Sequence, residues 1–156
     1  MQGLDLGGED ELVHAIKLVA TEYYRRTGKP LGATGEIAEL TAASLLGLEL
    51  CEARQAGFDA WDYSSGKPER VQIKGRAVDR AKPYSGRCSS IRHPQSYDTA
   101  ILVLLDRETM EPLEIFTALA GEVEAFLDIP GSKSRNERRS MGIAQFRSIG
   151  RKVWPN

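Results

Sequence analysis

The feature that most constrains the fold is the apolar run from Thr99 to Leu105, in which every side chain after Thr99 is aliphatic. A run of this length is far short of the ~20 residues that span a membrane. It predicts a strand that is buried on both faces of a sheet. The 156 residues are 41% hydrophobic and 28% charged, a size and composition typical of one globular domain. We therefore predict a single domain over residues 1–156.

The other elements follow from apolar periodicity and turn residues. Helical spacing predicts helices over residues 9–26, 34–46, 119–127 and 141–149. Strands are predicted from Leu48 and over residues 57–63, 69–75 and 113–117, the middle two joined as a hairpin by residues 64–67. Residues 76–97 and 131–140 are expected to be basic loops. This order of elements predicts a mixed α/β domain.

Charge is segregated along the chain, although the net charge is only −1. Bases dominate residues 67–92 and 133–152, each with a balance of +6, whereas residues 1–66 and 93–132 carry balances of −6 and −7. Two basic segments that converge in the fold would form a polyanion-binding face, and nucleic acid is its expected partner. The alternative is that both segments are ordinary solvated surface.

Polar residues on the predicted hairpin form a candidate site. Asp59 lies on the first arm, and the second arm carries Gln72 and Lys74. Because strand side chains alternate, Gln72 and Lys74 share a face, where Asp59 could reach them. Oxygen ligands can hold Mg²⁺, and an amine beside the metal can orient or deprotonate water, which suits phosphodiester hydrolysis. Glu39 and Asp62 are expected at the surface, although a register shift would exchange Asp62 for Asp59.

These residues carry a resemblance to a known superfamily. With Glu36 in the helix before the first strand, Asp59 at the start of the second and Gln72–Lys74 in the third, the sequence resembles the PD-(D/E)XK, or restriction endonuclease-like, nucleases. The Gln in place of an acid is similar to the pattern of Mrr-type restriction enzymes. The same region also looks like a family of small, functionally uncharacterised bacterial proteins of this fold. The resemblance covers residues 34–106 and implies a mixed sheet flanked by helices.

The resemblance also implies roles for individual residues. Asp59 would be the principal ligand of Mg²⁺ or Mn²⁺, Glu36 an accessory ligand, and Lys74 the residue beside the nucleophilic water. Gln72 would offer the metal a carbonyl oxygen without a charge. Metal affinity should then be weaker, and a DNA phosphate would complete the coordination shell.

The expected function is a metal-dependent endonuclease that hydrolyses DNA phosphodiester bonds. The alternatives are a catalytically inactive nucleic-acid-binding protein of the same fold and an α/β domain unrelated to nucleases. DNA is the expected partner, with RNA as an alternative, and a homodimer would suit the cutting of both strands. The residues expected to contact nucleic acid are Arg76, Arg80, Lys82, Arg87, Arg92 and His93.

Two remaining features concern metal and location. Cys51 and Cys88 lack the spacing of a zinc site. The acidic N-terminal segment lacks the basic start and apolar stretch of a secretory signal, so a cytoplasmic location is expected, with no membrane partner.

Overall fold

Six strands form one mixed sheet in the order β1-β2-β3-β4-β5-β6 in the computed structural model, which describes residues 7–52, 57–88, 90–91 and 96–156. The strands are β1 (Glu49–Leu50), β2 (Ala60–Asp62), β3 (Glu69–Val78), β4 (Thr99–Asp106), β5 (Pro112–Leu119) and β6 (Arg151–Trp154). The helices are α1 (Glu9–Thr27), α2 (Thr34–Leu46), α3 (Ala120–Asp128), α4 (Lys133–Arg138) and α5 (Ile143–Ile149). The predicted mixed α/β class is confirmed.

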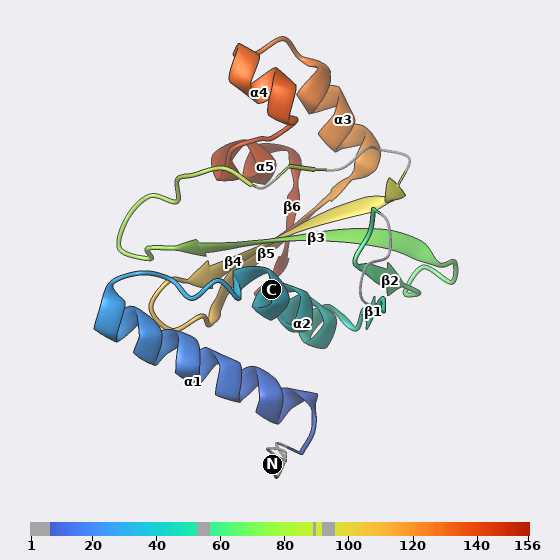
Figure 1. Cartoon of the computed structure of the whole chain (residues 1–156). Helices are drawn as coiled ribbons and strands as arrows, with labels where there is room; N and C mark the ends of the chain where they lie inside the picture. The colour runs from blue at the N-terminus through green and yellow to red at the C-terminus, as the bar shows by residue number, and fades with distance from the viewer. Residues whose placement is uncertain (1–6, 53–56, 89, 92–95) are drawn as a thin grey trace.

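Strand β4 lies at the centre of the sheet, parallel to β3 and antiparallel to β5. Its alternate side chains enter two separate apolar clusters. Ile101, Val103 and Leu105 pack in the cluster that includes residues of α1 and α2, whereas Leu102 and Leu104 pack with residues of α3 and α5. Figure 1 shows these two pairs of helices on opposite sides of the sheet. The prediction of a strand buried on both faces is confirmed.

The hairpin of β2 and β3 is also confirmed, with Trp61 opposite Arg70 and Asp62 opposite Glu69. In its turn, the backbone N–H of Ser64 donates to Asp62 Oδ1 at 2.8 Å, and Gly66 adopts a φ of 81°. A positive φ of this kind is easily reached only without a Cβ.

Three elements differ from the prediction. Strand β3 continues to Val78, so the segment expected to be a loop begins later than residue 76. The segment 131–140 contains the helix α4, where a loop was expected. The edge strand β6 was not predicted, because Arg151 and Lys152 give its four residues no apolar alternation. Among the described residues, no helix combines the length and the apolar character needed to cross a membrane.

Gly75 determines how closely α2 approaches the sheet. A Cβ on this residue would lie 2.5 Å from the Cβ of Ala38 and 2.8 Å from the carbonyl oxygen of Thr34. Both distances are far below van der Waals contact, so only glycine lets the first turns of α2 rest on β3 at this point. The helix ends at Leu46, and the next residue, Gly47, adopts the left-handed conformation common at helix C-termini.

Candidate functional site

An open pocket of about 430 Å³ lies where the first turns of α2 meet the middle of β3. Its walls include two carboxylates, Glu39 and Asp59, and two bases, Lys74 and Arg76. We refer to it as the Lys74 pocket. It brings together residues from α2, from the segment before β2 and from β3, which lie far apart in the sequence.

Two hydrogen bonds to backbone atoms of β3 position Asp59, which lies immediately before β2. Its N–H donates to the carbonyl oxygen of Val71 at 2.8 Å, and its Oδ2 accepts the N–H of Ile73 at 2.7 Å. The carboxylate is thereby fixed against β3, one residue away from Lys74.

Glu39 is half-buried in the wall of the pocket, although the sequence placed it at the surface. Burial raises the pKa of its carboxyl group above the usual value. The negative charges of Asp59 and Glu36 raise the pKa further, and the charge of Lys74 opposes them. Glu39 is therefore electrostatically coupled to the residues predicted for the site.

Glu36 occupies the first turn of α2 but is exposed and does not line the pocket. Its three-residue spacing from Glu39 puts the two carboxylates on neighbouring positions of one helix face. That spacing could have marked Glu39 as a candidate beside Glu36, but it gives no sign of the contact with β3. The packing of α2 on β3 determines which of the two carboxylates lines the pocket. The contact at Gly75 fixes that packing.

Gln72 is 2% exposed, and its Nε2 donates to the carbonyl oxygen of Gly57 at 3.1 Å. It is not among the residues that line the Lys74 pocket. Gly57 itself needs a φ of +98°, and a Cβ there would lie 2.3 Å from that of Ser96. Gln72 thus holds the segment that leads to Asp59 through its Nε2. The metal ligation by its carbonyl oxygen that the resemblance implies stays a prediction.

Asp62 lies elsewhere, at the end of β2, where its carboxylate accepts the N–H of Ser64. It lines a different pocket. The observed pairing of β2 with β3 therefore places Asp59, and not Asp62, beside Lys74.

The two basic segments meet, as the charge pattern suggested they could. The N–H of Cys88 donates to the carbonyl oxygen of Met141 at 2.9 Å, and the N–H of Ile143 donates to that of Gly86 at 3.0 Å. Arg76, in the wall of the pocket, donates through Nε to the carbonyl oxygen of Arg87. The joined segments therefore adjoin the Lys74 pocket through Arg76.

Several bases of these segments are already paired with carboxylates. Arg80 contacts Asp106 at 2.8 Å, and Lys82 contacts Asp79 at 3.3 Å. Arg87 is exposed and reaches Ser140 Oγ at 3.4 Å through a terminal nitrogen. The Lys82 side chain is 72% exposed, so its ion pair contributes little free energy and Lys82 can exchange a carboxylate for a phosphate at small cost. The Asp106 partner of Arg80 is buried, so that pair is more costly to break. Arg92 and His93, also predicted to contact nucleic acid, lie outside the described residues.

The donor set of the pocket fits one hard cation only in part. No group of three His, Cys, Asp or Glu side chains in the described ranges is arranged to hold a metal ion. Mg²⁺ in phosphate chemistry is often held by one or two carboxylates, with waters and substrate phosphates as the other ligands. Asp59 and Glu39 meet that smaller requirement, and a bound phosphate would have to complete it.

Comparison with protein-family models gives no match, and comparison with curated proteins gives none either.

Proposed function

We propose that the protein is a metal-dependent nuclease that hydrolyses DNA phosphodiester bonds at the Lys74 pocket. The observation that carries the proposal is the convergence of Asp59, Glu39 and Lys74 on one open pocket that adjoins two basic segments through Arg76. Carboxylates, an amine and a guanidinium are the groups that hydrolysis of a phosphodiester needs. The resemblance to PD-(D/E)XK nucleases supports the same assignment.

In this proposal each side chain has a defined task. Asp59 and Glu39 would hold Mg²⁺ or Mn²⁺, with Glu36 as an outer charge that strengthens the negative field. A bound metal ion would polarise the phosphate and lower the pKa of a coordinated water. Lys74 would orient the attacking water and stabilise the charge that develops on the phosphate. Arg76 and Arg87 would bind flanking phosphates of the DNA, with no selection of sequence.

The test is nicking of supercoiled plasmid, in Mg²⁺ or Mn²⁺ and in EDTA, by the wild type and two lysine variants. Lys74→Ala removes the pocket amine, whereas Lys67→Ala removes an exposed lysine of the β2–β3 turn. We expect metal-dependent nicking that Lys74→Ala abolishes and Lys67→Ala leaves unchanged. Nicking that survives Lys74→Ala would reject the proposed site, because the activity would then not depend on the pocket amine. A contaminating nuclease would give that result.

One observation favours a second candidate, a nucleic-acid-binding protein without catalysis. Gln72 stands where the resemblance expects an acid, and its amide is directed to Gly57. Loss of that acid leaves the metal with fewer charged ligands. Such a protein would bind DNA with a steep dependence on salt but would be indifferent to Mg²⁺. Binding measured by fluorescence anisotropy, with and without Mg²⁺, separates the two candidates when nicking is absent.

A further inference from the structure

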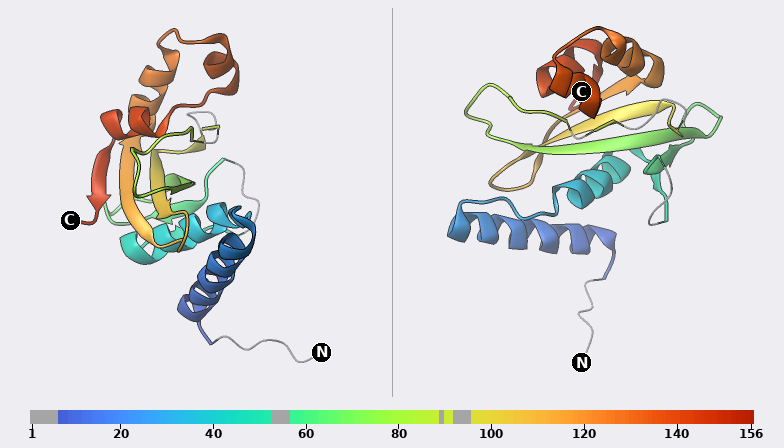
Figure 2. Two further views of the ribbon diagram at one scale, coloured as in Figure 1. Left: turned by 90° about the vertical axis from the view of Figure 1, so that its left-hand side faces the viewer. Right: turned by 45° about the horizontal axis from the view of Figure 1, so that its top comes forward.

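Helix α1 lies on the outside of the molecule, beyond α2 (Figures 1 and 2). It leaves large apolar side chains exposed. Leu12, Val19 and Tyr23 are 42%, 60% and 41% exposed. They are spaced so that they lie on one side of the helix. Ile16, half-buried against the core, borders them.

These residues belong to a longer regular pattern, which we call the α1 stripe. Its members are Glu9, Leu12, Ile16, Val19, Tyr23 and Arg26. Successive members are separated by three, four, three, four and three residues, the alternation found in the seam of paired helices. The order of the spacings is the same from either end, so the stripe matches itself when a second copy runs in the opposite direction.

The charges at the two ends of the stripe agree with that direction. The first turn of α1 is acidic, with Glu9 in the stripe, and the last turn is basic, with Arg26 in the stripe. In an antiparallel pair, Glu9 faces Arg26 of the other copy, Leu12 faces Tyr23, and Ile16 faces Val19. A parallel pair would instead bring like charges together at both ends.

We propose that two copies of this chain form a dimer through an antiparallel contact of their α1 stripes. A two-fold axis generates such a contact, because every residue pair then occurs twice. The contact involves one helix from each copy, so it falls below the area of a standard protein interface. The dimer is accordingly concentration-dependent and weakened by salt, which screens the end charges. This inference does not rest on the proposed nuclease activity.

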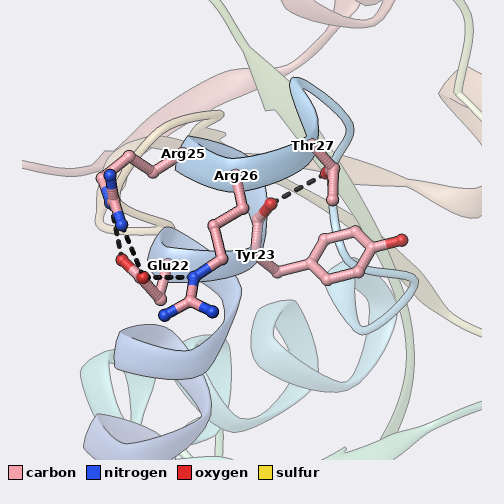
Figure 3. A network of polar contacts seen from close by, with 5 residues as sticks. All are labelled: Glu22, Tyr23, Arg25, Arg26 and Thr27. Atoms are coloured by element: carbon pink, nitrogen blue, oxygen red, sulfur yellow. Dashed lines mark hydrogen bonds and ion pairs between the residues drawn. The ribbon is translucent and has the colours of Figure 1, made fainter.

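Arg26 can serve such a contact without losing its present one. Glu22 binds both Arg25 and Arg26, and Arg26 uses Nε for this purpose (Figure 3). A guanidinium has five N–H donors. Its terminal nitrogens can therefore donate hydrogen bonds to Glu9 of a second copy while Nε keeps its bond to Glu22.

Sedimentation equilibrium across a range of protein concentrations tests the proposal with two matched variants. Val19→Glu places a charge in the centre of the stripe, whereas Leu18→Glu places the same charge at a neighbouring position outside it, with a similar exposure of 58%. We expect the wild type and Leu18→Glu to associate alike, and Val19→Glu to raise the dimer dissociation constant at least tenfold. A wild type that stays monomeric, or two variants that dissociate equally, would overturn the proposal. In the case of a monomeric wild type, any partner of the α1 stripe would be a molecule other than a second copy of this chain.

A second pair of variants tests the antiparallel register. Glu9→Arg should weaken the dimer because it faces Arg26, and Glu9→Arg combined with Arg26→Glu should restore association. Both substitutions place charges that interact unfavourably with the helix dipole. If they acted only through helix stability, the double variant would therefore form a weaker dimer than the single variant. Failure of the double variant to recover, with helicity checked by circular dichroism, would contradict this register.

Discussion

Two pockets of the described structure differ both in volume and in the chemistry of the residues that line them. The larger, of about 590 Å³, is lined by apolar residues that include Val71, Ile101 and Val153, and by the acids Asp62, Glu69 and Glu122. Those acids serve the local backbone and turns: Asp62 accepts the N–H of Ser64, and Glu122 accepts the N–H of Leu119.

The smaller Lys74 pocket sets Asp59 and Glu39 against Lys74, and burial, together with the charges of Asp59 and Glu36, raises the pKa of Glu39. Perturbed carboxyl groups that face a base in a cleft are typical of functional sites. Convergence of opposite charges, more than size, therefore marks the candidate site. We call the larger cavity the β6 pocket, because Arg151 and Val153 of β6 line it.

The largest expected effect comes from removing the carboxylate closest to Lys74. Asp59→Asn should lower the rate of plasmid nicking by about 10²-fold or more, because it removes a charged metal ligand while an oxygen can still accept the N–H of Ile73. The rates are to be compared at equal metal concentration. An unchanged rate would remove Asp59 from the chemistry.

The next effect concerns the packing that shapes the Lys74 pocket. Gly75→Ala should lower the free energy of unfolding by about 3 kcal/mol, since the new Cβ overlaps Ala38 and the carbonyl oxygen of Thr34. Urea denaturation measures the change. Gly121→Ala is the control, because a Cβ there meets nothing within 4 Å and α3 should gain stability by about 0.5 kcal/mol. Equal behaviour of the two variants would argue against close contact between α2 and β3.

A smaller effect, dependent on pH, is expected at Glu39. Its pKa is raised in the folded state, so the unfolded chain ionises first as pH rises. The stability contribution of the protonated group is complete below the unfolded pKa near 4.5 and is lost as pH rises through the folded pKa. Glu39→Gln should therefore be more stable than the wild type at pH 7 and alike at pH 4, by thermal unfolding. The opposite order at pH 7 would contradict the burial of this carboxylate.

The smallest effect is expected in the β6 pocket. Glu69→Gln changes one of its acids, whose Oε1 accepts the hydroxyl of Ser65 in the hairpin turn. The amide can accept the same bond, so stability should change by less than about 0.5 kcal/mol. Nicking should be unaffected. A loss of nicking as large as that of Asp59→Asn would contradict the assignment of the chemistry to the Lys74 pocket and not to the β6 pocket.

Sequence patterns predicted the elements whose periodicity is strong. The aliphatic run of β4, the turn residues of the β2–β3 hairpin and the spacing of α2 all correspond to observed elements. β6 and α4 were missed because both are short and rich in bases, and their structure depends on pairing with β5 or on local context.

The candidate site was predictable only in part, for a related reason. Local alternation predicted that Asp59 and Lys74 would lie close together on the hairpin, and the structure places both in the Lys74 pocket. The position of Glu39 depends on the distance between α2 and β3, which Gly75 sets through a tertiary contact. The supporting role of Gln72 depends on the path of the chain around Gly57. Neither contact leaves a local signal in the sequence.

The most direct test of the central claim is Mn²⁺ binding followed by electron paramagnetic resonance, with a short DNA duplex present to supply phosphate. Wild type and Asp59→Asn are to be titrated under the same conditions, with Asp62→Asn as the matched control from the β6 pocket. We expect one Mn²⁺ site, which DNA strengthens, Asp59→Asn removes and Asp62→Asn retains. Equal Mn²⁺ binding by all three proteins would contradict a metal site at the Lys74 pocket.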